Sequence, residues 1–219
     1  MEINDAVGRL NQQLPLKARQ DQLRPDLKRL HQAILNSLAT NGRTLTRDEI
    51  AETIGIEHVT EALTILGKND LVVLNEEGTE AVGAYPLTTA VTPHQLQIGD
   101  CEIYAMCALD AVSVAPMFNA DVMIHSRCHM TKDTVRIHMH GDEVIETMPI
   151  EPMVGIRWQI PCGVAAHSMC MEMVFIKDQE MAQVWQSEDT ENISLFNLPD
   201  SIAFGSSFFL PLMENSMTV

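Results

Sequence analysis

A thiol and a carboxylate lie three residues apart in a largely apolar segment of this chain. The segment YAMCALDAV, residues 104–112, contains Cys107 and Asp110, and its pattern predicts a helix with both side chains on one face. A thiolate is a soft nucleophile and metal ligand, and a desolvated carboxyl group can hold a proton for delivery. Free cysteines are more often small apolar core residues, however, and a helical Asp usually faces solvent. On these two residues alone, a packing role is favoured.

Two further cysteine segments, SRCH at 126–129 and HSMCMEMVF at 167–175, change that balance. With YAMCALD they form an ordered set that resembles the organomercurial (alkylmercury) lyases. In that family a Cys in a CALD context, an Asp three residues later and a distant second Cys form the active site. The resemblance extends over most of the chain, through a helical N-terminal module, the GAYPLTT segment and the AFGSSFF stretch near the end.

The resemblance implies that Cys107 and Cys170 are the two catalytic thiolates and that Asp110 is the acid and proton carrier. Cleavage of a carbon–mercury bond needs electron donation to the metal and a proton delivered to carbon, and soft thiolates suit the first task. The expected order is proton transfer from a thiol to Asp110, capture by both thiolates, and protonolysis. The products are a hydrocarbon and Hg(II) held between the two cysteines, with Asp110 beside it.

The same resemblance implies a role in mercury resistance and detoxification without an organic cofactor. Organomercurial small molecules are the expected substrates. Low-molecular-weight thiols or mercuric reductase are the expected acceptors of Hg(II), because release from two thiolates needs an external ligand.

Two positions depart from the family pattern. Met106 stands where an aromatic residue, commonly Trp, is expected, and Met171-Glu172 replaces a Cys-His pair after the second cysteine. Both changes leave the three central groups intact and bear on rate and substrate range, since Met106 would change the wall of the site. Cys162 is the rival for the second thiol, but Cys170 is preferred because the matching serine and Phe175 accompany it.

The other thiols and the histidines favour structural roles. Cys128 matches a family position with a structural role, and Cys101 follows a Gly-Asp turn without a partner at a suitable spacing. Alternating histidines on one strand, and two more flanking Cys128, are material for a zinc site. The alternating pair is His138 and His140, and the flanking pair is His125 and His129. The HMH segment lies between Arg136 and Asp142, as expected of a solvated strand face, so a structural role is favoured over a zinc site.

Composition restricts the class of protein. With 46% hydrophobic and 20% charged residues the chain suits a globular fold, and no apolar run approaches the ~20 residues needed to cross a bilayer. The formal net charge of -16 opposes binding to nucleic acid or anionic membranes. Five cysteines without a CxxC pair argue against a disulfide framework and indicate free thiols. The first residues lack a secretory pattern, so a cytoplasmic location is expected.

Residues 1–85 are predicted to form a winged helix-turn-helix-like module. One helix begins near Pro25 and stops at Asn41-Gly42, and Thr46 with Glu49 forms a capping box for the next. A third helix follows at once, and 71–85 is typical of a two-stranded wing. Phosphate contact needs basic residues, whereas this third helix is acidic, so the module is interpreted as a packing element or lid.

Residues 86–219 are predicted to form an α+β catalytic core, a mixed or antiparallel sheet with flanking helices on which the N-terminal module packs. A strand and turn at 95–100 precede the Cys107 helix, which Pro116 is expected to end. An antiparallel meander follows at 120–148, and later segments predict further strands and two helices.

Two other functions remain open from the sequence. One is a regulator whose winged helix binds DNA while the thiol domain senses a soft metal. The other is a mercury-binding relative that keeps the cysteines without turnover.

Overall fold

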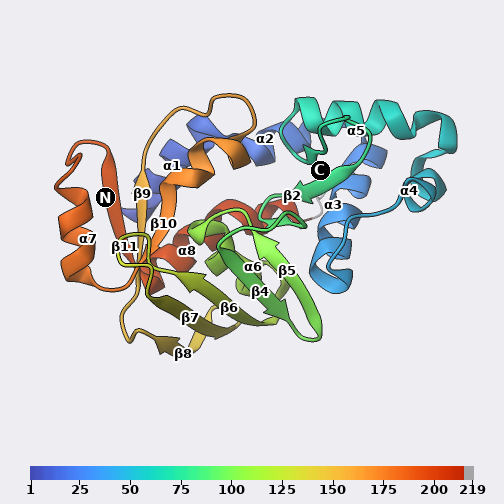
Figure 1. Ribbon diagram of the computed structural model, residues 1–219. Coiled ribbons are helices and arrows are strands. Elements are labelled where there is room, and N and C mark those ends of the chain that lie inside the picture. Colours follow the sequence, from blue (N-terminus) through green and yellow to red (C-terminus); the bar gives the residue numbers. More distant parts are fainter. Residues whose placement is uncertain (215–219) are drawn as a thin grey trace.

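The computed structural model describes residues 1–214 and has an α+β architecture built on two antiparallel sheets. In Figure 1 most of the larger sheet lies at the bottom, the smaller sheet at the left and the first five helices along the top and right. Helices α6 and α8 lie between these layers, at the centre of the molecule. The predicted α+β class with an antiparallel sheet and flanking helices is confirmed.

The N-terminal helices begin and end at the residues that the sequence indicates. Pro25 occupies the first turn of α3, and Gly42 ends that helix in the left-handed conformation at φ 63°. Thr46 and Glu49 form the predicted capping box of α4, because each side chain accepts a hydrogen bond from the backbone N–H of the other. The helices of this part are α1 (Ile3–Gln13), α2 (Leu16–Asp21), α3 (Pro25–Asn41), α4 (Arg47–Ile54) and α5 (Val59–Lys68).

The larger sheet has eight strands in the order β1-β2-β3-β5-β4-β6-β7-β8, and every neighbouring pair is antiparallel. Strands β6, β7 and β8 form the predicted meander. The strands are β1 (Val73–Leu74), β2 (Ala81–Ala84), β3 (Leu87–Thr88), β4 (His94–Ile98), β5 (Cys101–Ala105), β6 (Asp121–Arg127), β7 (Thr134–His140) and β8 (Glu143–Met148).

The smaller sheet has the order β10-β9-β11, and it carries the second half of the core. Its strands are β9 (Met153–Arg157), β10 (Met173–Ile176) and β11 (Ile193–Asn197). Helix α7 (Gln179–Gln186) covers one side of it, and α8 (Leu198–Phe209) packs on both β11 and α6 (Ala108–Phe118). Helix α6 also contacts β10 and four strands of the larger sheet, so it joins the two sheets.

The region predicted to be a wing is part of the larger sheet. Strands β1 and β2 pair as a hairpin, and β2 then pairs with β3 on the other side of the proposed boundary at residues 85 and 86. The winged-helix description and the division into 1–85 and 86–219 stay predictions, and residues 215–219 of the second range lie outside the described residues. None of the helices in residues 1–214 is both long and apolar enough to cross a membrane.

Two local predictions around α6 were wrong. Residues 104–107 are not helical, because β5 continues to Ala105 and Cys107 is the extended N-cap of α6 at φ -153° and ψ -179°. Pro116 does not end the helix, which continues to Phe118 and stops at left-handed Asn119. Proline near the end of a helix removes only one hydrogen bond, and the packing of α6 between two sheets and α8 compensates for it.

Gly205 allows α8 to approach α6 closely. A Cβ atom at Gly205 would lie 2.0 Å from Ser113 Oγ, and Ser113 is fully buried on α6. The Ser113 hydroxyl donates a hydrogen bond to the Leu109 carbonyl, so it has little freedom to move away. The glycine of the AFGSSFF stretch therefore fixes the position of the helix that carries Asp110.

A Gly205→Ala substitution is expected to destabilise the fold by about 1–2 kcal/mol. Overpacking costs about 1–3 kcal/mol, and alanine returns up to about 1 kcal/mol of helix propensity. Denaturant unfolding measures the change, and Gly8→Ala is the matched control because nothing lies within 4 Å of a Cβ there, in α1. A Gly205→Ala/Ser113→Ala pair should recover most of the loss; an unchanged loss in the pair would contradict this explanation.

Candidate active site

The thiol of Cys107 lies at the start of α6 and is almost completely buried. As the N-cap residue it accepts a hydrogen bond at Sγ from the backbone N–H of Asp110, at 3.3 Å. The thiol also approaches the thioether of Met173, with Sγ and Sδ 3.7 Å apart. N-cap geometry, rather than one face of a continuous helix, therefore brings Cys107 and Asp110 together.

Cys170 comes from a different element. It lies in a short 3-10 helix, Met169–Glu172, that leads directly into β10, and β10 contacts α6. One ligand atom each from Cys107, Asp110 and Cys170 can be chosen so that all three lie within 4.8 Å of one another. Among residues 1–214 this is the one group of three or more Cys, His, Asp or Glu side chains so arranged.

Burial controls the charge of this cluster. Burial raises the pKa of Asp110 to about 7, against the lowering effect of hydrogen bonds from the side chain and backbone of Cys107. Burial, followed by the hydrogen bond with Cys170 and the charge of Asp110, raises the pKa of the Cys107 thiol well above its usual value. The hydrogen bond with Cys107 lowers the pKa of Cys170, but burial and the charges of Asp110 and Asp70 together raise it. Both cysteines are therefore protonated at neutral pH.

The carboxyl group of Asp110 is suited to exchanging a proton. Asp110 is 2% exposed, and its Oδ2 atom has no hydrogen-bond partner among the described residues. A buried carboxyl oxygen without a partner favours the protonated form, and a pKa near 7 allows the group to accept and release a proton at neutral pH.

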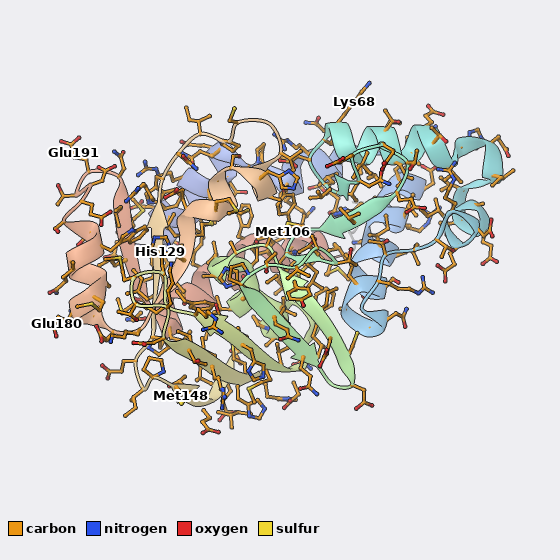
Figure 2. The ribbon with its side chains drawn as sticks, viewed as in Figure 1. Lys68, Met106, His129, Met148, Glu180 and Glu191 are labelled. Carbon is orange, nitrogen blue, oxygen red and sulfur yellow. The ribbon has the colours of Figure 1, made fainter. Side chains whose placement is uncertain are left out.

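A cavity of about 480 Å³ opens next to the cluster. Cys170 and Met173 line it directly, whereas Cys107 lies behind this wall with only 1% of its surface exposed. Figure 2 shows two other wall residues, with Met106 near the middle of the molecule and His129 toward the smaller sheet. Most of the lining is apolar, so the cavity suits a small organic group.

A hydrogen-bonded network connects the N-terminal part to the segment that carries Cys170. The Tyr85 hydroxyl donates to Asp70 Oδ1 at 2.9 Å and accepts from the backbone N–H of Ala166 at 2.9 Å. The other oxygen of Asp70 accepts from the N–H of Ala165 at 3.2 Å. The Tyr85 side chain is 1% exposed, so its bonds are protected from water. Tyr85 lies in the GAYPLTT segment, which pointed to the family and not to this residue, and no sequence pattern indicated Asp70.

A Tyr85→Phe substitution is expected to cost about 1–3 kcal/mol of stability, because it leaves the Ala166 N–H and an Asp70 oxygen unpaired. It should also reduce turnover of the site by up to about 10²-fold through displacement of Cys170. Tyr104→Phe, at the chain's only other tyrosine, is the matched control on partly exposed β5. Equal effects of the two substitutions in unfolding and turnover measurements would contradict this assignment.

The remaining cysteines lie outside the cluster. Cys162, the rival for the second thiol, is exposed. Cys128 is fully buried, in agreement with the predicted structural position, and Cys101 is partly buried beside Gly42. The structure therefore brings together the three residues predicted from the resemblance and leaves these three thiols apart.

The histidines do not form a metal cluster in residues 1–214. His138 and His140 alternate on β7, and both approach Asp121, with His138 Nε2 3.2 Å from its Oδ2 atom and His140 Nδ1 3.9 Å from the same oxygen. This arrangement agrees with the favoured interpretation of a solvated strand face.

Comparison with known families gives a match over the region that holds the cluster. Residues 87–210 match the model of the MerB family, described as alkylmercury lyase. This range covers more than half of the chain and includes all three residues of the cluster. The chain belongs to the alkylmercury lyase family. Membership confirms the resemblance drawn from the sequence and, with it, the predicted class of enzyme, since alkylmercury lyases are carbon–mercury lyases.

Individual members of the alkylmercury lyase family are similar over most of their length. An alkylmercury lyase of Bacillus cereus is 28% identical over 184 residues, which cover 84% of this chain and 81% of the relative. One from Staphylococcus epidermidis is 29% identical, with 80% of this chain and 79% of the relative covered. A crystal structure of the mercury-bound form of MerB2 matches in fold, with a TM-score of 0.74, 21% identity, and 90% and 98% of the two chains covered.

Proposed function

We propose that this chain is an organomercurial lyase that cleaves carbon–mercury bonds by protonolysis, with Cys107, Asp110 and Cys170 as its catalytic residues. The observation that carries the proposal is the buried arrangement of two thiols and a carboxyl group within 4.8 Å. Two soft donors and one proton carrier are the groups that this reaction needs. Mercury is the substrate's own metal, and no organic cofactor enters the reaction.

The reaction begins with replacement of the thiol protons by mercury. An organomercurial that carries one exchangeable ligand meets two thiols. One thiol proton passes to the Asp110 carboxylate, and the other leaves with the displaced ligand. Bonding of both thiolates increases the electron density on mercury and weakens its bond to carbon. The Asp110 carboxyl group then protonates carbon, and the electron pair of the carbon–mercury bond forms the new carbon–hydrogen bond. A hydrocarbon leaves, and Hg(II) remains between Cys107 and Cys170.

Release of Hg(II) then requires external thiols. Low-molecular-weight thiols or mercuric reductase are the acceptors in this proposal, because a metal held by two thiolates leaves only by exchange with another soft ligand. The proposal places this step in the cytoplasm, which keeps thiols reduced.

Residues 1–85 act in this proposal as a packing element for the catalytic core, 86–219, rather than as a reader of DNA. The bonds from Asp70 and Tyr85 to the segment before Cys170 support a structural role. The third helix of the predicted winged helix, α5, follows Glu57 and contains Glu61, which oppose phosphate contact. Nucleic acid and membranes are therefore not partners in this proposal.

The departures at Met106 and Met171-Glu172 affect the wall of the cavity. Met106 and Met171 both line it. A flexible methionine in place of a rigid aromatic ring leaves a more adaptable surface, so the proposal includes both alkyl and aryl mercurials as substrates.

Headspace gas analysis tests the proposed function. Reduced protein is incubated with phenylmercury and an excess of a small thiol, and benzene is measured over many equivalents of enzyme. Catalytic benzene release is the expected result. Tight binding of mercury without benzene would instead indicate a mercury-binding relative, and DNA binding at low salt in a gel-shift experiment would favour the metal-responsive regulator.

A further inference from the structure

We propose that Met173 is a third sulfur donor, whose thioether contacts the mercury held between Cys107 and Cys170. The inference rests on the proposed function, because it needs mercury at the two cysteines. Met173 was not among the site residues predicted from the sequence. With Met173, three sulfur atoms instead of two would contact mercury.

The geometry at Cys107 supports this role. The Cys107 thiol has one proton to donate, with Met173 Sδ, Cys170 and Asp110 as possible acceptors, and its sulfur atom lies 3.7 Å from Met173 Sδ. Mercury takes the place of that proton when it binds the thiolate. A metal ion on this side of Cys107 therefore meets a lone pair of the thioether without a large movement of either residue.

The position of Met173 in the chain supports the same role. It is the first residue of β10, three residues after Cys170, and its pairing with Ile156 of β9 fixes its backbone. Its side chain is 3% exposed and lines the cavity beside Cys170. The thioether thus lies between the cavity and the buried thiol.

The chemistry of a thioether suits a partner of two thiolates. It is a soft donor, it carries no charge, and it has no proton to lose, so its bonding to mercury does not depend on pH. Asp110, the other neighbour, is a hard carboxyl ligand that must remain free to give its proton to carbon. A neutral sulfur donor holds mercury without competing for that proton.

The other two methionines of the cavity wall differ from Met173. The methyl carbon of Met106 points to Gly83, where an added Cβ would lie 2.8 Å from it. Met171 is 65% exposed at the rim of the cavity. They provide matched controls, because each can be changed to leucine in the same cavity wall.

The test uses Hg(II) alone and measures the sulfur atoms around mercury by X-ray absorption spectroscopy. The full reduced chain and its Met106→Leu and Met171→Leu variants should have a third, longer mercury–sulfur contact, and Met173→Leu should have only two contacts. In competition with a small thiol, Met173→Leu should retain Hg(II) on the order of 10-fold less well. Leucine preserves the packing, so a purely structural methionine predicts no change in either measurement.

A measurement without any variant covers the case in which Met173→Leu fails to fold. In selenomethionine-substituted protein, selenium should appear in the mercury shell, and its absence would overturn the proposal. Unchanged coordination and retention in Met173→Leu would overturn it as well. Benzene release by the unaltered protein is measured separately, and its absence would contradict the proposed lyase activity. Two-sulfur coordination with normal benzene release would contradict only the role of Met173.

Discussion

A Cys107→Ser variant should lose turnover of phenylmercury by at least about 10³-fold, as expected when one member of a group that acts as a unit is removed. Serine differs by one atom, but its hydroxyl is a hard and weakly acidic donor that binds mercury poorly. The N-cap function survives, since a serine oxygen accepts the Asp110 N–H as well as a thiol does. The loss in benzene release should therefore appear in a protein of unchanged stability.

Cys170→Ser should lose as much activity, and the double variant should be no worse than either single variant. Mercury needs both thiolates before its bond to carbon weakens, so the effects are not additive. Cys162→Ser is the matched control and should keep full activity, because Cys162 is exposed and lies outside the cluster. An active Cys170→Ser together with an inactive Cys162→Ser would mean that the second thiol has been assigned to the wrong residue.

Asp110→Asn should slow benzene release by about 10²–10⁴-fold, the range for loss of a general acid or base. An amide cannot accept the thiol proton or pass one to carbon. Both cysteines remain, so the variant should still bind Hg(II), and this separates the proton carrier from the mercury ligands. Asp142→Asn, at the exposed turn between β7 and β8, is the control and should leave the rate unchanged.

The same substitution should change how stability depends on pH. Burial raises the pKa of Asp110 from 3.8 to about 7, so the folded chain binds more protons than the unfolded chain in this interval. Its stability contribution is therefore present at low pH and is lost as pH rises through about 4 to 7. Relative to unaltered protein, Asp110→Asn should gain roughly 4 kcal/mol across that window, at about 1.4 kcal/mol for each unit of pKa.

Denaturant unfolding at a series of pH values measures this difference. Comparison with the unaltered protein cancels the other titrating groups, and any constant cost from the buried amide does not alter the slope. A difference that stays constant from pH 4 to 8 would show that Asp110 is already ionised in the folded protein. The combined expectation, lower activity with better stability above pH 7, means that catalysis here requires a carboxyl group that is unfavourable for folding.

The residues of the cluster could be predicted from the sequence because they lie in short, ordered motifs. Cys107, Asp110 and Cys170 were assigned by resemblance, and the structure places their side chains together although Cys107 and Cys170 lie far apart in the chain. The antiparallel meander and the capping box were likewise predictable, because alternation and capping are local patterns.

Features that depend on tertiary packing were not predictable from those patterns. Strand β5 was not predicted, because residues 104–107 are apolar and their pattern fits either a helix or a strand. Only the pairing with β3 and β4 decides between the two. Helix α6 runs past Pro116 because of its neighbours. The bonds of Tyr85 to Asp70 and to Ala166 connect residues far apart in the chain and follow no spacing rule.

The raised pKa values of the two buried thiols also govern their oxidation. The thiolate form of cysteine attacks peroxides and disulfides, and a buried, protonated thiol reacts slowly with both. Cys107 and Cys170 are 1% and 4% exposed and keep their protons at neutral pH, whereas Cys162 lies in the open. Mercury bonds to sulfur strongly enough to displace those protons. We therefore expect Cys162 to be oxidised faster than the two cysteines of the cluster.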